Sequence, residues 1–175
     1  AVLGGDRAAV LAAIAKFNLT AANENGGGQI VAAGELAALA ALAENPPEGA
    51  RVRSLSVAGA FHTSYMQPAV ARMKSLSSSV TVHDPRTRVI SNRDGAVVSD
   101  GREVLDRIVN QIANPVRWDL CMETLRAQGV TGVIELAPGG TLAGLIKRAA
   151  PEIEQLALKS PADIAAAREF AARHG

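Results

Sequence analysis

The stretch that decides the fold is LTAANENGGGQIVAA, residues 19–33. We predict one strand over residues 19–25 and a second strand over residues 29–33. The three glycines between them, Gly26 to Gly28, can adopt positive φ without steric cost, which favours a hairpin turn. The stretch therefore predicts two strands that are adjacent and antiparallel in one sheet.

The segments on either side of this hairpin complete a regular order of strands and helices. We predict a strand over residues 1–3, a helix that Asp6 caps and that runs to about Phe17, a helix over residues 35–44, and a strand over residues 51–57. Two prolines end the second helix. The resulting β-α-β-β-α-β order is typical of a ferredoxin-like fold.

The rest of the chain alternates between helical and strand patterns. Helices are predicted over residues 65–76, 102–112, 117–128 and 141–148 and after Asp163, and strands over residues 88–91, 132–136 and 153–158. In the second of these helices we expect an inward face made of Val104, Leu105, Ile108, Val109 and Ile112. Strands separated by helices indicate an α/β protein.

The composition narrows the classes of function. The 175 residues are 48% hydrophobic and carry a formal charge of +1, which indicates a globular protein and argues against a dedicated nucleic-acid binder. No apolar run approaches the roughly 20 residues that cross a membrane, and we expect no signal peptide, since no basic start followed by an apolar core is found. The single Cys121 excludes an intrachain disulfide and a cysteine metal cluster, and we expect a buried, inert thiol. We therefore expect a cytoplasmic protein without a metal site.

His62 is the side chain best suited to proton transfer. It follows an apolar segment and is surrounded by small residues in VAGAFHTS, residues 57–64, so we expect it at the end of a strand. Such a histidine is either structural, or a general base whose other ring nitrogen is oriented by a carboxylate or a backbone carbonyl. We expect His83 to lie in a solvated loop and His174 to fray with the chain end.

Two further segments place polar groups next to glycines. The amides of Asn23 and Asn25 can position a polar ligand, or they can be ordinary turn residues. Residues 138–140 open a helix whose N-terminus can attract an anion, and a plain connection from strand to helix is the simpler interpretation. The chain contains no G-x-S-x-G, so no serine occupies a nucleophile elbow of that kind.

Taken in order, five motifs resemble the C-terminal part of the malonyl-CoA:acyl-carrier-protein transacylases, the acyltransferases of bacterial fatty-acid synthesis. They are N-x-N-x-x-x-Q-I-V-A-A-G (residues 23–34), G-A-F-H-T (59–63), S-N-R-D-G (91–95), Q-I-A-N-P-V-R-W (111–118) and E-L-A-P-G-G-T-L-x-G-L-x-K-R (135–148). The resemblance covers essentially the whole chain. The alanine-rich style and R-W-D-L-C at residues 117–121 resemble the actinobacterial members.

The resemblance implies a fold and a reaction. Residues 1–57 are expected to form a ferredoxin-like small subdomain, and residues 58–175 the C-terminal part of an α/β-hydrolase-like acyltransferase core. Members of this family transfer a malonyl group from malonyl-CoA to the phosphopantetheine thiol of acyl carrier protein through a seryl acyl-enzyme. The resemblance implies no cofactor. The expected partners are malonyl-CoA and acyl carrier protein, with no nucleic acid and no membrane, and the complete enzyme is expected to be a monomer.

The resemblance also implies roles for individual residues. His62 matches the family's general base, and Gln111 matches the residue whose backbone carbonyl holds that histidine. Asn23 and Asn25 match amides that line the CoA side of the cleft. Phe61 resembles the malonyl-type residue whose ring crowds an α-methyl group.

The family's serine nucleophile, in G-H-S-x-G, lies upstream of the matched region. We therefore expect this chain alone to be inactive and not to be acylated by malonyl-CoA. One alternative is a piece of an acyltransferase domain from a polyketide or fatty-acid synthase. A second alternative, from another class, is a non-catalytic ferredoxin-like binding module in which His62 is inert. A G-H-S-x-G motif encoded before Ala1 would favour the enzyme over the binding module.

Overall fold

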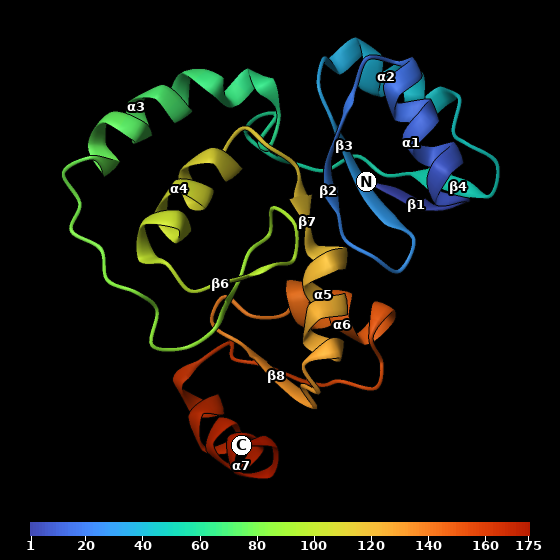
Figure 1. The fold of residues 1–175 in the computed structure, drawn as a ribbon. Coiled ribbons are helices and arrows are strands. Elements are labelled where there is room, and N and C mark those ends of the chain that lie inside the picture. The colour runs from blue at the N-terminus through green and yellow to red at the C-terminus, as the bar shows by residue number, and fades with distance from the viewer. The chain divides into compact units, whose positions relative to one another are not determined.

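The computed structural model describes residues 1–175 and has a mixed α/β fold (Figure 1). It divides into two compact units, Ala1–Cys121 and Met122–Gly175. The boundary between the units falls inside helix α5, Trp118–Ala127. No helix combines the length and the apolar character needed to cross a bilayer.

The first unit begins with a four-stranded antiparallel sheet in the order β4-β1-β3-β2. Its elements follow one another as β1 (Val2–Gly4), α1 (Arg7–Lys16), β2 (Thr20–Glu24), β3 (Gln29–Ala33), α2 (Leu36–Glu44) and β4 (Ala50–Val52). A fifth strand, β7 (Val116–Arg117), pairs in parallel with the outer side of β2. The predicted β2–β3 hairpin is confirmed, and all three of its glycines have positive φ.

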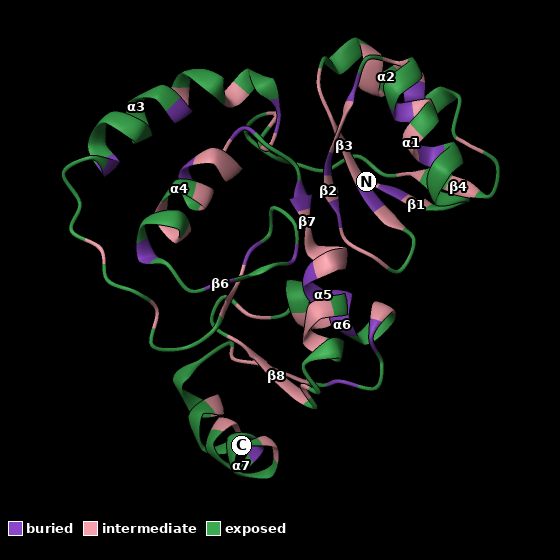
Figure 2. Ribbon diagram, viewed as in Figure 1, coloured by how far each residue is buried: buried purple, intermediate pink, exposed green.

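Helices α1 and α2 pack on one face of this sheet and form its core (Figure 1). Asp6 caps α1 as predicted, since its side chain accepts a hydrogen bond from the Ala9 N–H at 2.9 Å. The apolar spacing along α1 places Val10 and Ile14 against the sheet, and Leu42 from α2 is fully buried beside them. In Figure 2 the buried stretches of α1 and of the neighbouring strands are purple.

A β-bulge in β2 changes which side chains face the helices. Ala21 pairs with Ala32, but Asn23 pairs with Val31, so Ala22 is an extra residue in this strand. Before the bulge, Ala21 lies on the helix side together with its partner Ala32. After the bulge Asn23 shares the opposite, open face with Val31.

The rest of the first unit contains two packed helices and a short hairpin. Its elements are a 3-10 turn (Ser64–Met66), α3 (Gln67–Ser77), β5 (Val89–Ile90), β6 (Val97–Val98) and α4 (Gly101–Gln111). Val70 of α3 packs against Val109 of α4 and Ala113. The β5–β6 turn needs Gly95, which has a φ of +71° and whose added Cβ would lie 2.6 Å from the backbone of Leu120.

The second unit is built on two parallel strands. β8 (Gly132–Glu135) pairs with β9 (Glu154–Ala157), and α6 (Thr141–Ala149) connects them. After a 3-10 turn (Pro161–Asp163), the chain ends in α7 (Ile164–His174), which contacts β8.

Several expectations about the fold were wrong. The strand predicted over residues 51–57 ends at Val52, because no neighbouring strand lies beside the residues that follow. His62 consequently lies in a loop and not at the end of a strand. Ile108 is 60% exposed, although we expected it to face inward.

His174 does not fray. Its Nε2 lies 2.8 Å from a carboxylate oxygen of Glu154, and its Nδ1 lies 3.0 Å from the hydroxyl of Thr131. Its ring centroid is 4.4 Å from that of Phe170 in the preceding turn. These contacts hold the last turn of α7, so sequence position alone was a poor guide to its order.

Candidate active site

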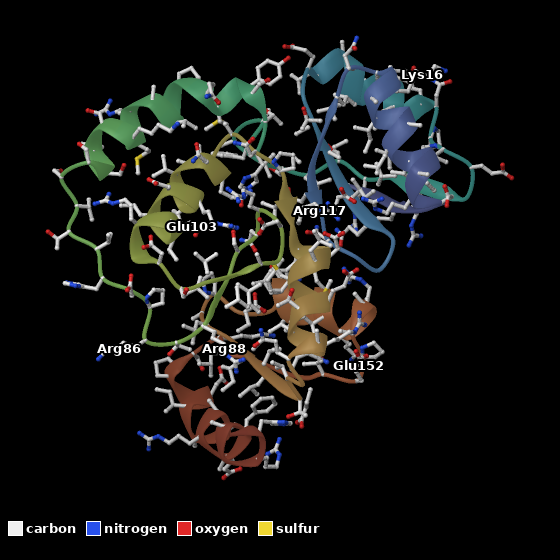
Figure 3. The ribbon with its side chains drawn as sticks, viewed as in Figure 1. Lys16, Arg86, Arg88, Glu103, Arg117 and Glu152 are labelled. Carbon is white, nitrogen blue, oxygen red and sulfur yellow. The ribbon has the colours of Figure 1, made fainter.

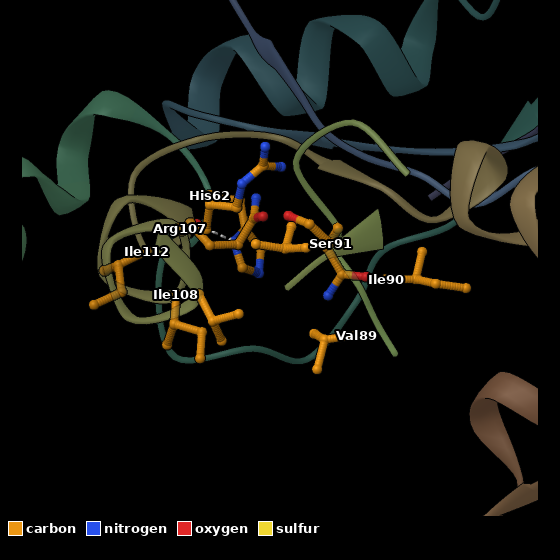
Figure 4. Close-up of a pocket in the computed structure, with 11 residues that line it drawn as sticks. His62, Val89, Ile90, Ser91, Arg107, Ile108 and Ile112 are labelled. Carbon is orange, nitrogen blue, oxygen red and sulfur yellow. Dashed lines mark hydrogen bonds between the residues drawn. The ribbon is translucent and has the colours of Figure 1, made fainter. Parts of the chain in front are cut away.

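His62 is held by the C-terminal end of helix α4. Its backbone N–H donates to the carbonyl of Ile112 at 3.1 Å, and its ring Nδ1 lies 2.7 Å from the carbonyl oxygen of Gln111 (Figure 4). The last carbonyls of a helix have no partner within the helix, so they are available to an incoming donor. Two adjacent carbonyls thus fix both the backbone and the ring of this histidine.

The contact with Gln111 determines which tautomer the imidazole adopts. A carbonyl oxygen only accepts hydrogen bonds, so the proton of the neutral ring must sit on Nδ1. Nε2 then carries the lone pair and is the atom that can accept a proton. The ring is therefore oriented as a base by a main-chain group, without a carboxylate partner on Nδ1.

The loop around His62 has an uncommon backbone conformation. His62 has a φ of +62°, which costs a residue with a side chain about 1–3 kcal/mol. The buried Thr63 compensates by donating its hydroxyl to the Ala60 carbonyl at 2.6 Å. Tyr65 fixes the other side of the loop, because its hydroxyl donates to Glu35 at 2.7 Å. The loop thus presents His62 in one defined orientation.

The side chain of Gln111 shapes the turn that follows α4. Its amide donates to the carbonyls of Asn114 at 2.8 Å and Pro115 at 2.7 Å. Because the turn leads directly into β7, these bonds connect the residue that holds His62 to the strand that pairs with β2.

The other predicted site residues lie on two separate elements. Asn23 is on β2, and the backbone N–H of Asn25 donates to Gln29 at 3.0 Å at the start of the glycine turn. The bulge in β2 puts Asn23 on the face of the sheet away from α1 and α2. Phe61 precedes His62 and is 47% exposed. The structure thus brings His62 and Gln111 into direct contact and connects the asparagines to them through β7.

A pocket of about 310 Å³ opens beside His62 (Figure 4). Its walls are largely apolar side chains of β5, β6 and α4, with the polar groups of His62, Gln111, Arg107, Ser91 and Asn92. Arg107 is nearly buried and bonds Asp94 and Glu103, both at 2.7 Å. Partial burial raises the pKa of the Asp94 carboxyl, but the Ala96 N–H and Arg107 outweigh it and hold that pKa below its ordinary value. The charge of Arg107 is therefore balanced by its own neighbours.

The helix N-terminus at residues 138–140 is already occupied by a carboxylate of the chain. Glu135 accepts hydrogen bonds from the backbone N–H groups of Gly140 at 2.7 Å, Leu142 at 2.9 Å and Ala143 at 2.8 Å. This connection is therefore a capped helix start, as the simpler interpretation held. The prediction of a buried Cys121 is also confirmed, and burial raises the pKa of its thiol to about 11.

Sequence reasoning missed the role of Glu24, which lies between Asn23 and Asn25. Its carboxylate is almost buried and bonds Arg7 at 2.6 Å. Little in the sequence indicated this ion pair, because Arg7 lies on another element and is 17 positions away.

Comparison with solved structures defines the class of protein. The fold is similar to that of MCAT from Mycobacterium tuberculosis, with a TM-score of 0.88 and 48% identity over 93% of this chain and 54% of that one. It is also similar to the malonyl-transacylase in a complex with AntF, a type II PKS acyl-carrier protein. There the TM-score is 0.84 and the identity 27%, over 96% of this chain and 57% of that one. By fold the chain therefore resembles acyltransferases.

Comparison of sequences specifies the family within this class. The malonyl CoA-acyl carrier protein transacylase of Mycobacterium tuberculosis is 48% identical over 164 residues, which is 94% of this chain and 54% of that protein. No family model matches the chain. The chain is homologous to the C-terminal part of the malonyl CoA-acyl carrier protein transacylases and spans about half the length of the curated relatives it matches.

Proposed function

We propose that this chain supplies the base-bearing part of a malonyl-CoA:acyl-carrier-protein transacylase. The enzyme transfers a malonyl group from malonyl-CoA to the phosphopantetheine thiol of acyl carrier protein through a seryl acyl-enzyme. The observation that carries the proposal is the 2.7 Å contact between His62 Nδ1 and the Gln111 carbonyl, which leaves Nε2 free to act as a base. The homology to transacylases named for this reaction supports it.

His62 serves both half-reactions in this proposal. Nε2 removes the serine proton as the oxygen attacks the malonyl thioester, and the resulting imidazolium gives that proton to the departing CoA thiolate, which leaves as the thiol. In the second half-reaction Nε2 removes the proton of the phosphopantetheine thiol. The sulfur then attacks the acyl-enzyme, and the proton returns to the serine oxygen. Gln111 keeps the ring in one orientation throughout, because its carbonyl accepts from Nδ1–H in both charge states.

Asn23, Asn25 and Phe61 bind and select the substrate in this proposal. The pantetheine arm carries two amide groups, which asparagine side chains can both donate to and accept from. The half-exposed ring of Phe61 lies next to the base and occupies space that an α-methyl group would need. A clash of that size gives a discrimination of about 1–3 kcal/mol against methylmalonyl-CoA.

The order of strands and helices supports a finer description of the architecture. We propose that residues 1–57 form a ferredoxin-like subdomain and that residues 58–175 belong to an α/β-hydrolase-like core. The β4-β1-β3-β2 order, with both helices on one face, supports the first part. The parallel β8–β9 pair joined by α6 supports the second. The proposal includes a monomeric, cytoplasmic enzyme. We propose that it needs no cofactor, because moving an acyl group from one thiol to another by nucleophilic attack changes no oxidation state and needs only an acid–base group.

The test uses a chimera in which the N-terminal part of the Mycobacterium tuberculosis transacylase precedes this chain. The chimera should transfer malonyl from CoA to acyl carrier protein, and His62→Ala should slow the acylation step by about 10²–10⁴-fold. His83→Ala, at an exposed histidine, is the matched control and should act like the parent. A folded His62→Ala chimera that is acylated as fast as its parent would overturn the proposed role.

A second measurement uses the isolated 175-residue chain. Intact mass spectrometry after incubation with malonyl-CoA should show no covalent malonyl adduct, since no G-x-S-x-G is present. An adduct on the chain would mean that the nucleophile lies within residues 1–175 and that the proposed division of the site is wrong.

A further inference from the structure

Glu24 is a nearly buried acid at the end of strand β2. Only 9% of the residue is exposed, and it lies between the two asparagines proposed to bind substrate. Glu24 pairs with Ile30 after the bulge, so its side chain lies on the helix side, whereas Asn23 points to the open face. A charge in this position needs ionic partners to offset the loss of hydration.

Those partners come from two different elements. Arg7, at the start of α1, bonds Glu24 through Nη2 at 2.6 Å and through Nε at 2.8 Å. Arg117, on β7, places its Nε 3.5 Å from the other carboxylate oxygen. Arg117 also bonds Asp119 at 2.9 and 2.8 Å, so two arginines and two acids form one continuous network. Figure 3 labels Arg117 at the point where β7 ends and α5 begins.

The network crosses a weak junction in the sheet. β2 and β7 pair over only two positions, Asn23 with Val116 and Glu24 with Arg117. Parallel pairing of two residues contributes little by itself, because it forms few backbone hydrogen bonds. The ionic contact occurs in that same register, between the residues of the second pair. It therefore stabilises the one arrangement in which these two strands are aligned.

β7 is firmly attached on its other side. Its Arg117 N–H donates to the carbonyl of Asn92 at 2.6 Å, and the Pro115 carbonyl just before it accepts from the side chain of Gln111 at 2.7 Å. The carbonyl of Gln111 in turn contacts His62. A continuous series of contacts thus runs from Glu24 through Arg117 to the residue that orients the base.

We propose that Glu24 is a positioning residue of this site: its ion pair with Arg117 fixes the end of β2 that carries Asn23 and Asn25 relative to β7. The importance of this position for substrate binding rests on the proposed function, whereas the fixing of the strand does not. Since His62 and Gln111 are held by α4, loss of Glu24 should loosen the asparagines and leave the base in place.

The first experiment measures the strand itself in the isolated 175-residue chain. In Glu24→Gln, NMR amide exchange at residues 23–25 and 116–117 should be about tenfold faster than in the parent, and the side-chain amide signals of Asn23 and Asn25 should shift. The ring ¹⁵N signals of His62 should not change. Glu44→Gln, at an exposed glutamate of α2 with no ion pair, is the matched control. Unchanged exchange in Glu24→Gln would overturn the proposal.

Further variants separate the ion pair from a general loss of stability. Glu24→Asp keeps the charge and should recover part of the slow exchange, while Arg117→Gln should reproduce the effect of Glu24→Gln. The double variant should lose less than the sum of the two single effects, because both single variants remove the Glu24–Arg117 contact while each also loses a contact of its own, with Arg7 or with Asp119. Strictly additive effects would overturn the proposal. If Glu24→Gln does not fold, the comparison of Arg117→Gln with the parent decides the question.

The second experiment measures substrate binding in the chimera. Glu24→Gln should raise the KM for malonyl-CoA about tenfold and leave kcat within twofold, because it disturbs contacts remote from the reacting bond. A merely structural role would reduce the amount of active enzyme and leave KM unchanged, and that result would overturn the positioning role. If the parent chimera transfers no malonyl, the proposed function fails, and the exchange experiment still decides whether Glu24 fixes the strand.

Discussion

Replacing Glu135 by alanine removes the carboxylate that caps helix α6. The two oxygens of Glu135 accept backbone hydrogen bonds from Gly140, Leu142 and Ala143 at 2.7–2.9 Å. These are N–H groups of the first turn, which have no partner inside the helix. The carboxylate also carries a negative charge at the positive end of the helix dipole.

The magnitude follows from this geometry. Loss of a helix cap costs about 0.5–2 kcal/mol, and three charge-assisted bonds place Glu135 near the upper end. A loss of about 2 kcal/mol in the local opening free energy accelerates amide exchange by about 30-fold. We therefore expect the Leu142 and Ala143 amides to exchange about 30-fold faster in Glu135→Ala. Glu135→Gln keeps an accepting oxygen without the charge and should give a smaller acceleration.

The effect should depend on pH in a defined direction. Partial burial raises the pKa of the Glu135 carboxyl, but the N–H groups of Ala143, Leu142 and Gly140 outweigh it, so the pKa in the folded protein is below its ordinary value. The stabilisation is therefore complete above the unfolded pKa and is lost as the pH falls through the folded pKa. Parent and Glu135→Ala should differ most near neutral pH and converge in acid.

The assay is native-state hydrogen exchange followed by NMR across this pH range. Glu169→Ala is the matched control, because it removes an exposed glutamate of α7 for which no partner is observed. Rates at Leu142 and Ala143 that stay within twofold of the parent in Glu135→Ala would refute the capping argument. Equal differences at neutral and acid pH would refute the role of the charge.

Three further predictions concern packing and burial. Leu42→Ala should lower the free energy of unfolding by about 3 kcal/mol in urea titrations, because Leu42 is 0% exposed. The control is Leu36→Ala, which should change that free energy by less than about 0.5 kcal/mol, because Leu36 is 84% exposed. If Leu42→Ala lowers the free energy of unfolding by less than about 1 kcal/mol, Leu42 does not pack in the core between the sheet and its helices. Cys121 should react slowly with thiol reagents in the folded protein and rapidly in denaturant, since burial raises its pKa to about 11; equal rates would show an accessible thiolate. His174→Ala should speed proteolysis of α7, because the ring contacts Phe170 and Glu154, and unchanged cleavage would mean that these contacts do not hold the helix.

Elements with local signals were predicted well from the sequence. The strand at residues 29–33 has the predicted ends, and the helix predicted over residues 141–148 differs by one residue. Caps, prolines and hydrophobic spacing lie within a few residues of the elements they control. β6 and β7 were missed because each is only two residues long and exists through a partner elsewhere in the chain.

The residues of the candidate site were also predicted only where the signal is local. His62 and the asparagines were identified from the sequence as chemically capable, and the resemblance added Gln111. The expected strand before His62 was wrong, because positive φ at a histidine depends on the Ile112 carbonyl and Thr63, which no local pattern reveals. The role of Glu24 was missed for a similar reason, since Arg117 reaches it only after β7 has paired with β2.

By itself the sequence determined the order of strands and helices in the first 52 residues, the glycine hairpin and the homology to transacylases, because backbone preferences and residue identity are local properties. Only the tertiary structure decided which face of the sheet Asn23 occupies, which ring nitrogen of His62 carries the proton, and that Glu135 fills its own helix N-terminus. Each of these depends on a strand register or on a hydrogen bond between groups that meet only in the folded chain.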